Sequence, residues 1–122
     1  MFVYIREAHP ADGWQMKENV RDDVVYNKPK SFAERRAVAT HCCSRMSLEM
    51  PCVVDDMENS GDALYAGWPE RMFIIGADGK IAYAGEQGPW GFNPNEVELW
   101  LRKHLGQPHR CNLLKAGIKN PP

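Results

Sequence analysis

The chain has 122 residues, of which 43% are hydrophobic and 25% are charged, which fits one globular domain with a modest core better than two. Fifteen Lys and Arg residues against sixteen Asp and Glu residues give a formal net charge of -1, so no basic field favours nucleic acid or an anionic membrane. No apolar run approaches the roughly 20 residues that span a bilayer. We therefore expect a cytoplasmic location by default.

The first half of the chain alternates strand and helix signals. Residues 2–5 are aromatic and β-branched, which predicts a strand, and the polar residues 14–30 predict a short helical turn and a loop. The sequence SFAE at residues 31–34 has the pattern of a capping box, so we expect a helix over about residues 32–47. A short buried strand is expected over residues 52–54.

The second half predicts a short helix, a hairpin and a closing helix. The helix is expected around residues 62–66, and the strands 72–75 and 81–84 flank an Asp-Gly turn. Asn93 and Pro94 predict the start of a helix that ends before Gly106. Four apolar residues of that helix are expected to face the sheet: Val97, Trp100, Leu101 and Leu105.

This order of elements predicts a mixed α/β domain over residues 1–106 and an extended or mobile tail over residues 107–122. The four cysteines show no CxxC spacing and no paired Cys/His spacing, so we expect no metal, no cofactor and reduced thiols. Packing is the simpler interpretation of Cys42, Cys43 and Cys52, because free cysteine behaves as a small hydrophobe. A resolving role in redox chemistry stays open for Cys52.

The segment YAGWPERMFII at residues 65–75 places a proline just before a strand, and a hairpin and a closing helix follow. This arrangement resembles the C-terminal half of a thioredoxin fold. The resemblance implies a cis peptide bond before Pro69, beside the active site. An ordinary trans proline at a strand start is the alternative.

A narrower match lies near the start of the chain. The segment YIREAHPADGW at residues 4–14 resembles the pattern YI-x-EAH-x-x-DGW of the iodothyronine deiodinases. Further segments follow in the same order and spacing: VVD at 53–55, PER at 69–71 and GPWGFNP at 88–94. The likeness covers about residues 2–105 and implies a thioredoxin-like fold.

In that family a selenocysteine, or a cysteine in some relatives, takes iodine from a small-molecule substrate, and a thiol reductant then regenerates it. The resemblance implies that His9 is the proton donor and Glu7 its orienting partner. Their i, i+2 spacing puts both side chains on one side of an extended segment. Trp14 would form a pocket wall for an aromatic substrate, and Pro69 would lie beside it.

Other interpretations stay open for these residues and for the whole chain. Glu7 and His9 also fit a surface carboxylate and a loop histidine, and Trp14 also fits a core filler. A thioredoxin-like peroxide or disulfide reductase and a non-catalytic binding module are the alternative functions. A homodimer is also open.

The family's nucleophile, with its strand and helix, is expected upstream of Met1, so we expect the 122-residue chain alone to be inactive. In a thioredoxin sheet that strand lies between the strands 2–5 and 72–75, which must otherwise pair directly. One hypothesis is that a selenocysteine codon was read as a stop codon. An in-frame TGA or TGC codon in the upstream DNA would support it.

Overall fold

The computed structural model describes residues 1–106; the predicted tail over residues 107–122 lies outside the described residues. The elements in chain order are β1 (Phe2–Tyr4), α1 (Lys17–Arg21), α2 (Phe32–Arg45), β2 (Cys52–Val54), α3 (Ser60–Tyr65), β3 (Phe73–Ile75), β4 (Ile81–Ala84) and α4 (Pro94–Leu105). The mixed α/β architecture predicted from the sequence is confirmed, and every predicted strand and helix has a counterpart.

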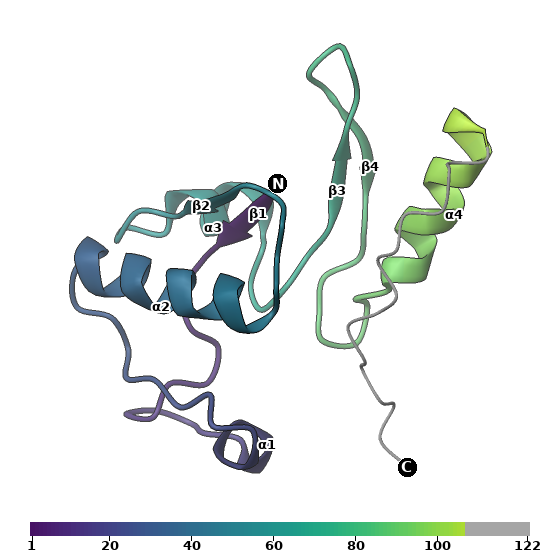
Figure 1. The fold of residues 1–122 in the computed structure, drawn as a ribbon. Coiled ribbons are helices and arrows are strands. Elements are labelled where there is room, and N and C mark those ends of the chain that lie inside the picture. Colours follow the sequence, from purple (N-terminus) through teal and green to yellow (C-terminus); the bar gives the residue numbers. More distant parts are fainter. Residues whose placement is uncertain (107–122) are drawn as a thin grey trace.

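The strands form two separate two-stranded sheets within the described residues. β1 pairs with β2 in parallel, with Phe2 opposite Cys52, and β3 pairs with β4 in antiparallel fashion. The hairpin turn contains Gly79 at φ +77°, a conformation that favours glycine. Direct pairing of β1 with β3, one of the two arrangements considered from the sequence, is therefore wrong. Figure 1 shows the hairpin standing apart from β1 and β2.

Both longer helices begin at side-chain caps that the sequence predicted. The Ser31 hydroxyl accepts a hydrogen bond from the Glu34 amide at 3.2 Å, and the Asn93 side chain accepts from the Asn95 amide at 3.2 Å. The reciprocal half of the capping box differs from the expected form, because the Glu34 carboxylate accepts from the amide of Lys30 at 2.6 Å. The chain entering α2 is thus fixed on both sides of the cap.

The core lies between α2 and β2. Ala39 of α2 is 2% exposed, and only it and Pro29 are buried apolar residues in residues 1–106. Cys52 and Val54 are half-buried, whereas Val53 between them is exposed, as the alternation along a strand requires. Val3 of β1 is exposed as well, so the face of this sheet opposite α2 is open.

The closing helix α4 contacts the hairpin through part of its apolar face. Val97, Trp100 and Leu101 are half-buried, and the Trp100 ring lies 6.5 Å from the ring of Tyr83 in β4. Leu105 is 74% exposed, so the expectation that it faces the sheet is wrong. It is the last residue of α4, at the end of the helix that leans away from the hairpin (Figure 1).

Candidate functional site

The carboxyl ends of β1 and β2 lie at the same edge because the two strands are parallel. The ladder continues one residue beyond β2, where the Asp55 amide donates to the Tyr4 carbonyl at 2.8 Å. Beyond this point the two chains separate, and residues 5–10 and 55–59 carry most of the nearby polar side chains. Sites in α/β proteins gather at such an edge.

Arg35 in the first turn of α2 closes this edge from the helix side. It is 3% exposed, and its guanidinium donates to the Asp55 and Asp56 carbonyls and, at 2.9 Å, to the Asn59 side chain. Its Nε is buried and has no hydrogen-bond partner among the described residues. The buried guanidinium of Arg35 therefore lies beside the strand ends with one N–H donor that has no partner in this part of the chain.

Glu7 lies close enough to Arg35 for their charges to interact. Burial raises the pKa of the Glu7 carboxyl above its ordinary value, and the positive charge of Arg35 opposes this only in part. Its Oε1 atom is buried and has no hydrogen-bond partner among the described residues. The Glu7 charge also acts on the Cys42 thiol, whose pKa is raised by burial, then by Cys43 and then by Glu7. Glu7 therefore points toward the α2 side of the edge.

His9 and Trp14 form a pair in the loop that follows β1. Their rings meet edge to face, with centroids 4.5 Å apart at an interplanar angle of 76°. His9 is half-buried, and its Nδ1 is buried without a hydrogen-bond partner in residues 1–106. Trp14 is 74% exposed, which excludes the core-filler interpretation. The Trp14 indole thus lies against one side of His9 and remains exposed to solvent.

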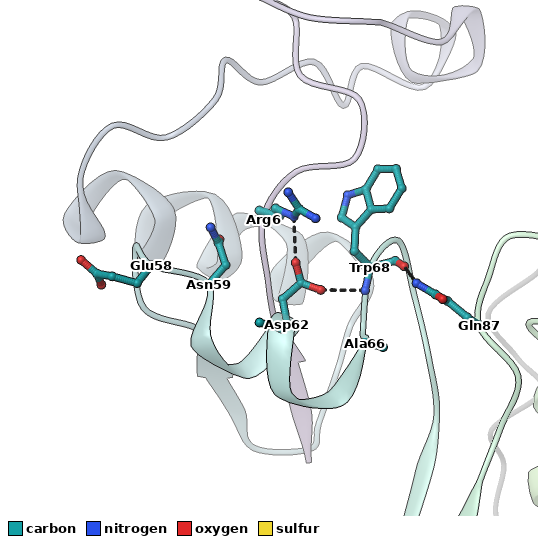
Figure 2. Close-up of a pocket in the computed structure, with 8 residues that line it drawn as sticks. Arg6, Glu58, Asn59, Asp62, Ala66, Trp68 and Gln87 are labelled. Carbon is teal, nitrogen blue, oxygen red and sulfur yellow. Dashed lines mark hydrogen bonds and ion pairs between the residues drawn. The ribbon is translucent and has the colours of Figure 1, made fainter.

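A second polar cluster lies on the other side of the segment after β1. The buried carboxylate of Asp62 in α3 accepts from Arg6 Nε at 2.8 Å and from the Trp68 amide at 2.9 Å. The Arg6 guanidinium also lies 5.4 Å from the centre of the Trp68 ring. Figure 2 shows Arg6 and Trp68 side by side above Asp62, at a cleft of about 380 Å³.

Asp55 organises the start of α3 behind this cleft. Its carboxylate accepts from the Gly61 amide at 2.8 Å and from the Asp62 amide at 2.9 Å. A Cβ atom on Gly61 would lie 2.8 Å from the Asp55 carboxylate, so a residue without a side chain is required here. Asp55 thereby fixes the position from which Asp62 holds Arg6 and Trp68.

The Trp68–Pro69 peptide bond is cis, which confirms the expectation for Pro69. Pro69 is half-buried and directly follows the residue that contacts Arg6. Glu7 directly follows Arg6. The sequence neighbours of Glu7 and Pro69 therefore meet across the cleft, and the two predicted site segments are brought together.

Four polar or aromatic residues of this region were not nominated from the sequence: Arg6, Arg35, Asp62 and Trp68. Arg35 had a detectable signal, because it lies four and seven residues before Ala39 and Cys42 on the same face of α2. A charged residue at an apolar helix position indicates a buried polar contact. Arg6 and Asp62 meet only through the tertiary fold, and local spacing gives no sign of their pairing.

Three further properties of residues 1–106 bear on function. No group of three or more His, Cys, Asp or Glu side chains in this segment is placed to hold a metal ion. None of its helices combines the length and apolar character that crossing a membrane demands. The cysteines at 42, 43 and 52 are all free thiols.

Taken together, the fold and the site define a mixed α/β protein in which Glu7 and the buried Arg35 lie near each other where parallel strands end, and His9 lies against Trp14 in the loop that follows. The chain belongs to the iodothyronine deiodinase family, whose sequence profile matches residues 1–105.

Individual relatives agree with this membership. The chain is 41% identical over 103 residues to the type I iodothyronine deiodinase of Xenopus laevis. The aligned region covers 84% of this chain and 38% of that protein. It is 36% identical over 110 residues to the thyroxine 5-deiodinase of Bos taurus, covering 89% and 35% respectively. It is also 36% identical over 109 residues to the type II iodothyronine deiodinase of Rattus norvegicus, covering 88% and 41%. The chain thus spans about two fifths of the length of these relatives.

Proposed function

We propose that this chain is the proton-handling part of a deiodinase-like oxidoreductase with a thioredoxin-like fold. Its substrate is a small iodinated aromatic, and its reductant is a thiol. A selenol or thiol nucleophile takes the iodine from carbon, and the carbon takes a proton in its place. Two equivalents of thiol then return the nucleophile to its reduced form and release iodide, while the thiols become a disulfide.

The observation that carries this proposal is the pair of unpartnered buried atoms on Glu7 and His9. More than nine in ten buried polar groups in folded proteins have a hydrogen-bond partner, so such atoms are exceptions that need a cause. Two of the four such side-chain atoms in residues 1–106 belong to Glu7 and His9, which match the family's EAH pattern near the carboxyl ends of parallel strands; the other two are Arg35 Nε and Gln15 Nε2. A substrate or nucleophile bound at this edge would supply the missing partners.

We assign the roles accordingly. His9 donates the proton to carbon, since histidine is the residue type whose ordinary pKa lies closest to neutral pH. Glu7 would orient the imidazole once the site is occupied, since the two side chains share no hydrogen bond in residues 1–106. Trp14, whose ring meets that of His9 edge to face, would offer its exposed surface to an aromatic ring, and Pro69, next to Trp68, would lie beside the substrate.

We further propose that the nucleophile comes from outside residues 1–122, on a strand that lies between β1 and β3. β1 pairs only with β2 and β3 only with β4 in the described part of the chain, so each has an edge free for this strand. The chain also spans only about two fifths of its relatives. A thioredoxin-like sheet would then run through all five strands.

The test compares two substrates with the complete protein and excess dithiothreitol. We expect iodide release from a mono-iodinated phenol, and we expect the 122-residue chain alone to release none under the same conditions. Faster turnover of hydrogen peroxide than of the iodophenol would instead support a peroxide reductase. Absence of both activities in the complete, reduced protein would favour a binding module.

A further inference from the structure

The last turns of α2 and the start of β2 bring two cysteines to one place. Cys43 lies near the C-terminal end of α2 and Cys52 is the first residue of β2, with eight residues between them. Both are half-buried, and both line a cavity of about 550 Å³ between the helix and the strand. The reversal of the chain after α2 therefore places two thiols on the same wall.

The Cys43 thiol lies close enough to act on the Cys52 thiol. The pKa of Cys52 is raised to about 11, first by burial and then by the Cys43 side chain. The preceding residue, Cys42, has a different environment, because its thiol lies 3.6 Å from the sulfur of Met46 and feels the charge of Glu7. Successive residues of a helix point about 100° apart, which separates the two neighbouring thiols.

We propose that Cys43 and Cys52 form a dithiol pair that exchanges with low-molecular-weight disulfides and closes a reversible disulfide between α2 and β2. The pair is separate from the Glu7 and His9 site and does not depend on the function proposed above. It is a second redox site in the same chain.

The exchange takes two balanced steps. The thiolate of one cysteine attacks glutathione disulfide, so that a protein–glutathione disulfide forms and one glutathione leaves as thiolate. The second cysteine then attacks the protein sulfur of this mixed disulfide, and the second glutathione leaves. In total two protein thiols are oxidised to one disulfide, and one glutathione disulfide is reduced to two glutathione molecules.

The consequence for the fold is a covalent link between two elements that already pack together. α2 also carries Arg35 and Cys42, whose charge and thiol lie near Glu7. The disulfide would fix this helix against β2.

The experiment measures the link in the reduced, purified complete protein. Samples are incubated with excess glutathione disulfide, quenched with acid, labelled with N-ethylmaleimide and digested with trypsin. We expect a cross-link between the peptides 37–45 and 46–71, together with the loss of two labelled thiols. A protein that carries only glutathione adducts, with no cross-link, would overturn the proposal.

Because Cys42 and Cys43 share one tryptic peptide, substitutions identify the partner. Cys43→Ser and Cys52→Ser should each lower the cross-linked fraction at least tenfold, whereas the matched control Cys42→Ser should leave it unchanged. Loss of the link in Cys42→Ser with its retention in Cys43→Ser would contradict the assignment. Fragment spectra of the wild-type cross-link give the same information without any substitution, so a variant that fails to fold does not remove the test.

Discussion

At the scale of single residues, Glu7 combines a role in the proposed chemistry with an unfavourable environment. Its carboxyl is largely removed from water, one oxygen has no partner among the described residues, and the nearby charge of Arg35 does not fully compensate. Residues that contribute to activity often lower the free energy of unfolding of the protein, and such costs are common at active sites. The contribution of Glu7 to the free energy of unfolding should therefore depend on pH.

Replacing Glu7 by Gln tests this environment. The folded-state pKa of Glu7 is raised above the ordinary 4.5, so its contribution to stability is fully present below pH 4.5 and is lost as pH rises through the raised value. Glu7→Gln removes the charge, so its free energy of unfolding should exceed that of the wild type at pH 7. The difference should vanish below pH 4.5. Urea titrations of both proteins at pH 4 and pH 7 measure it.

Glu49→Gln is the matched control, because Glu49 is exposed. It should leave the pH dependence of the wild type unchanged. A Glu7→Gln variant that is less stable than the wild type at pH 7 would show that Arg35 stabilises the ionised carboxylate more than burial destabilises it.

At the scale of elements, Arg35 joins the N-terminal turn of α2 to the end of β2 and the start of α3. Three of its contacts are acceptors on the chain after β2: the Asp55 and Asp56 carbonyls and the Asn59 side chain. Hydrogen bonds from a charged donor to buried carbonyls are stronger than neutral ones, and their loss leaves the carbonyls unpaired.

Arg35→Ala should therefore lower the free energy of unfolding by about 3 kcal/mol. Its neighbour Arg36 is exposed, and Arg36→Ala should change the same quantity by less than about 0.5 kcal/mol. Urea denaturation followed by circular dichroism gives both values. Equal effects of the two substitutions would mean that the bonds of Arg35 contribute little net stability.

Sequence patterns predicted the local features of these elements well. Ser31 and Asn93 predict the starts of their helices correctly, because a capping side chain accepts a hydrogen bond from an amide only two or three residues away. The burial of Arg35 and the ion pair of Arg6 with Asp62 escaped prediction because their partners lie 20 or more residues distant. The prediction for Leu105 was wrong for a related reason, since the way α4 lies against the hairpin decides how much of the helix is covered, and no local pattern sets it (Figure 1).

The candidate site also combines features that local sequence predicts with contacts that only the tertiary fold creates. Glu7, His9 and Trp14 were nominated from one continuous segment, and the structure pairs His9 with Trp14 inside it. Their surroundings come from α2 and α3, which no local pattern connects to that segment. The catalytic roles of these residues remain a prediction.

At the scale of the whole molecule, the two sheets are short and each leaves backbone edges unpaired in residues 1–106. Val3 and Val53 are also exposed on the open face of the first sheet. A strand inserted between β1 and β3 would pair both edges and bring a nucleophile to the carboxyl ends where Glu7 lies. We therefore predict the proposed activity for a protein that carries such a strand.

The most direct test of this account is the rate of iodide release by the complete protein after His9→Ala. General acid catalysis contributes about 100-fold or more, so kcat should fall by at least that factor, while His104→Ala, at an exposed position of α4, should retain the wild-type rate. Circular dichroism of each variant confirms that it folds. A folded His9→Ala protein that releases iodide within about twofold of the wild-type rate would contradict the assignment of His9 as the proton donor.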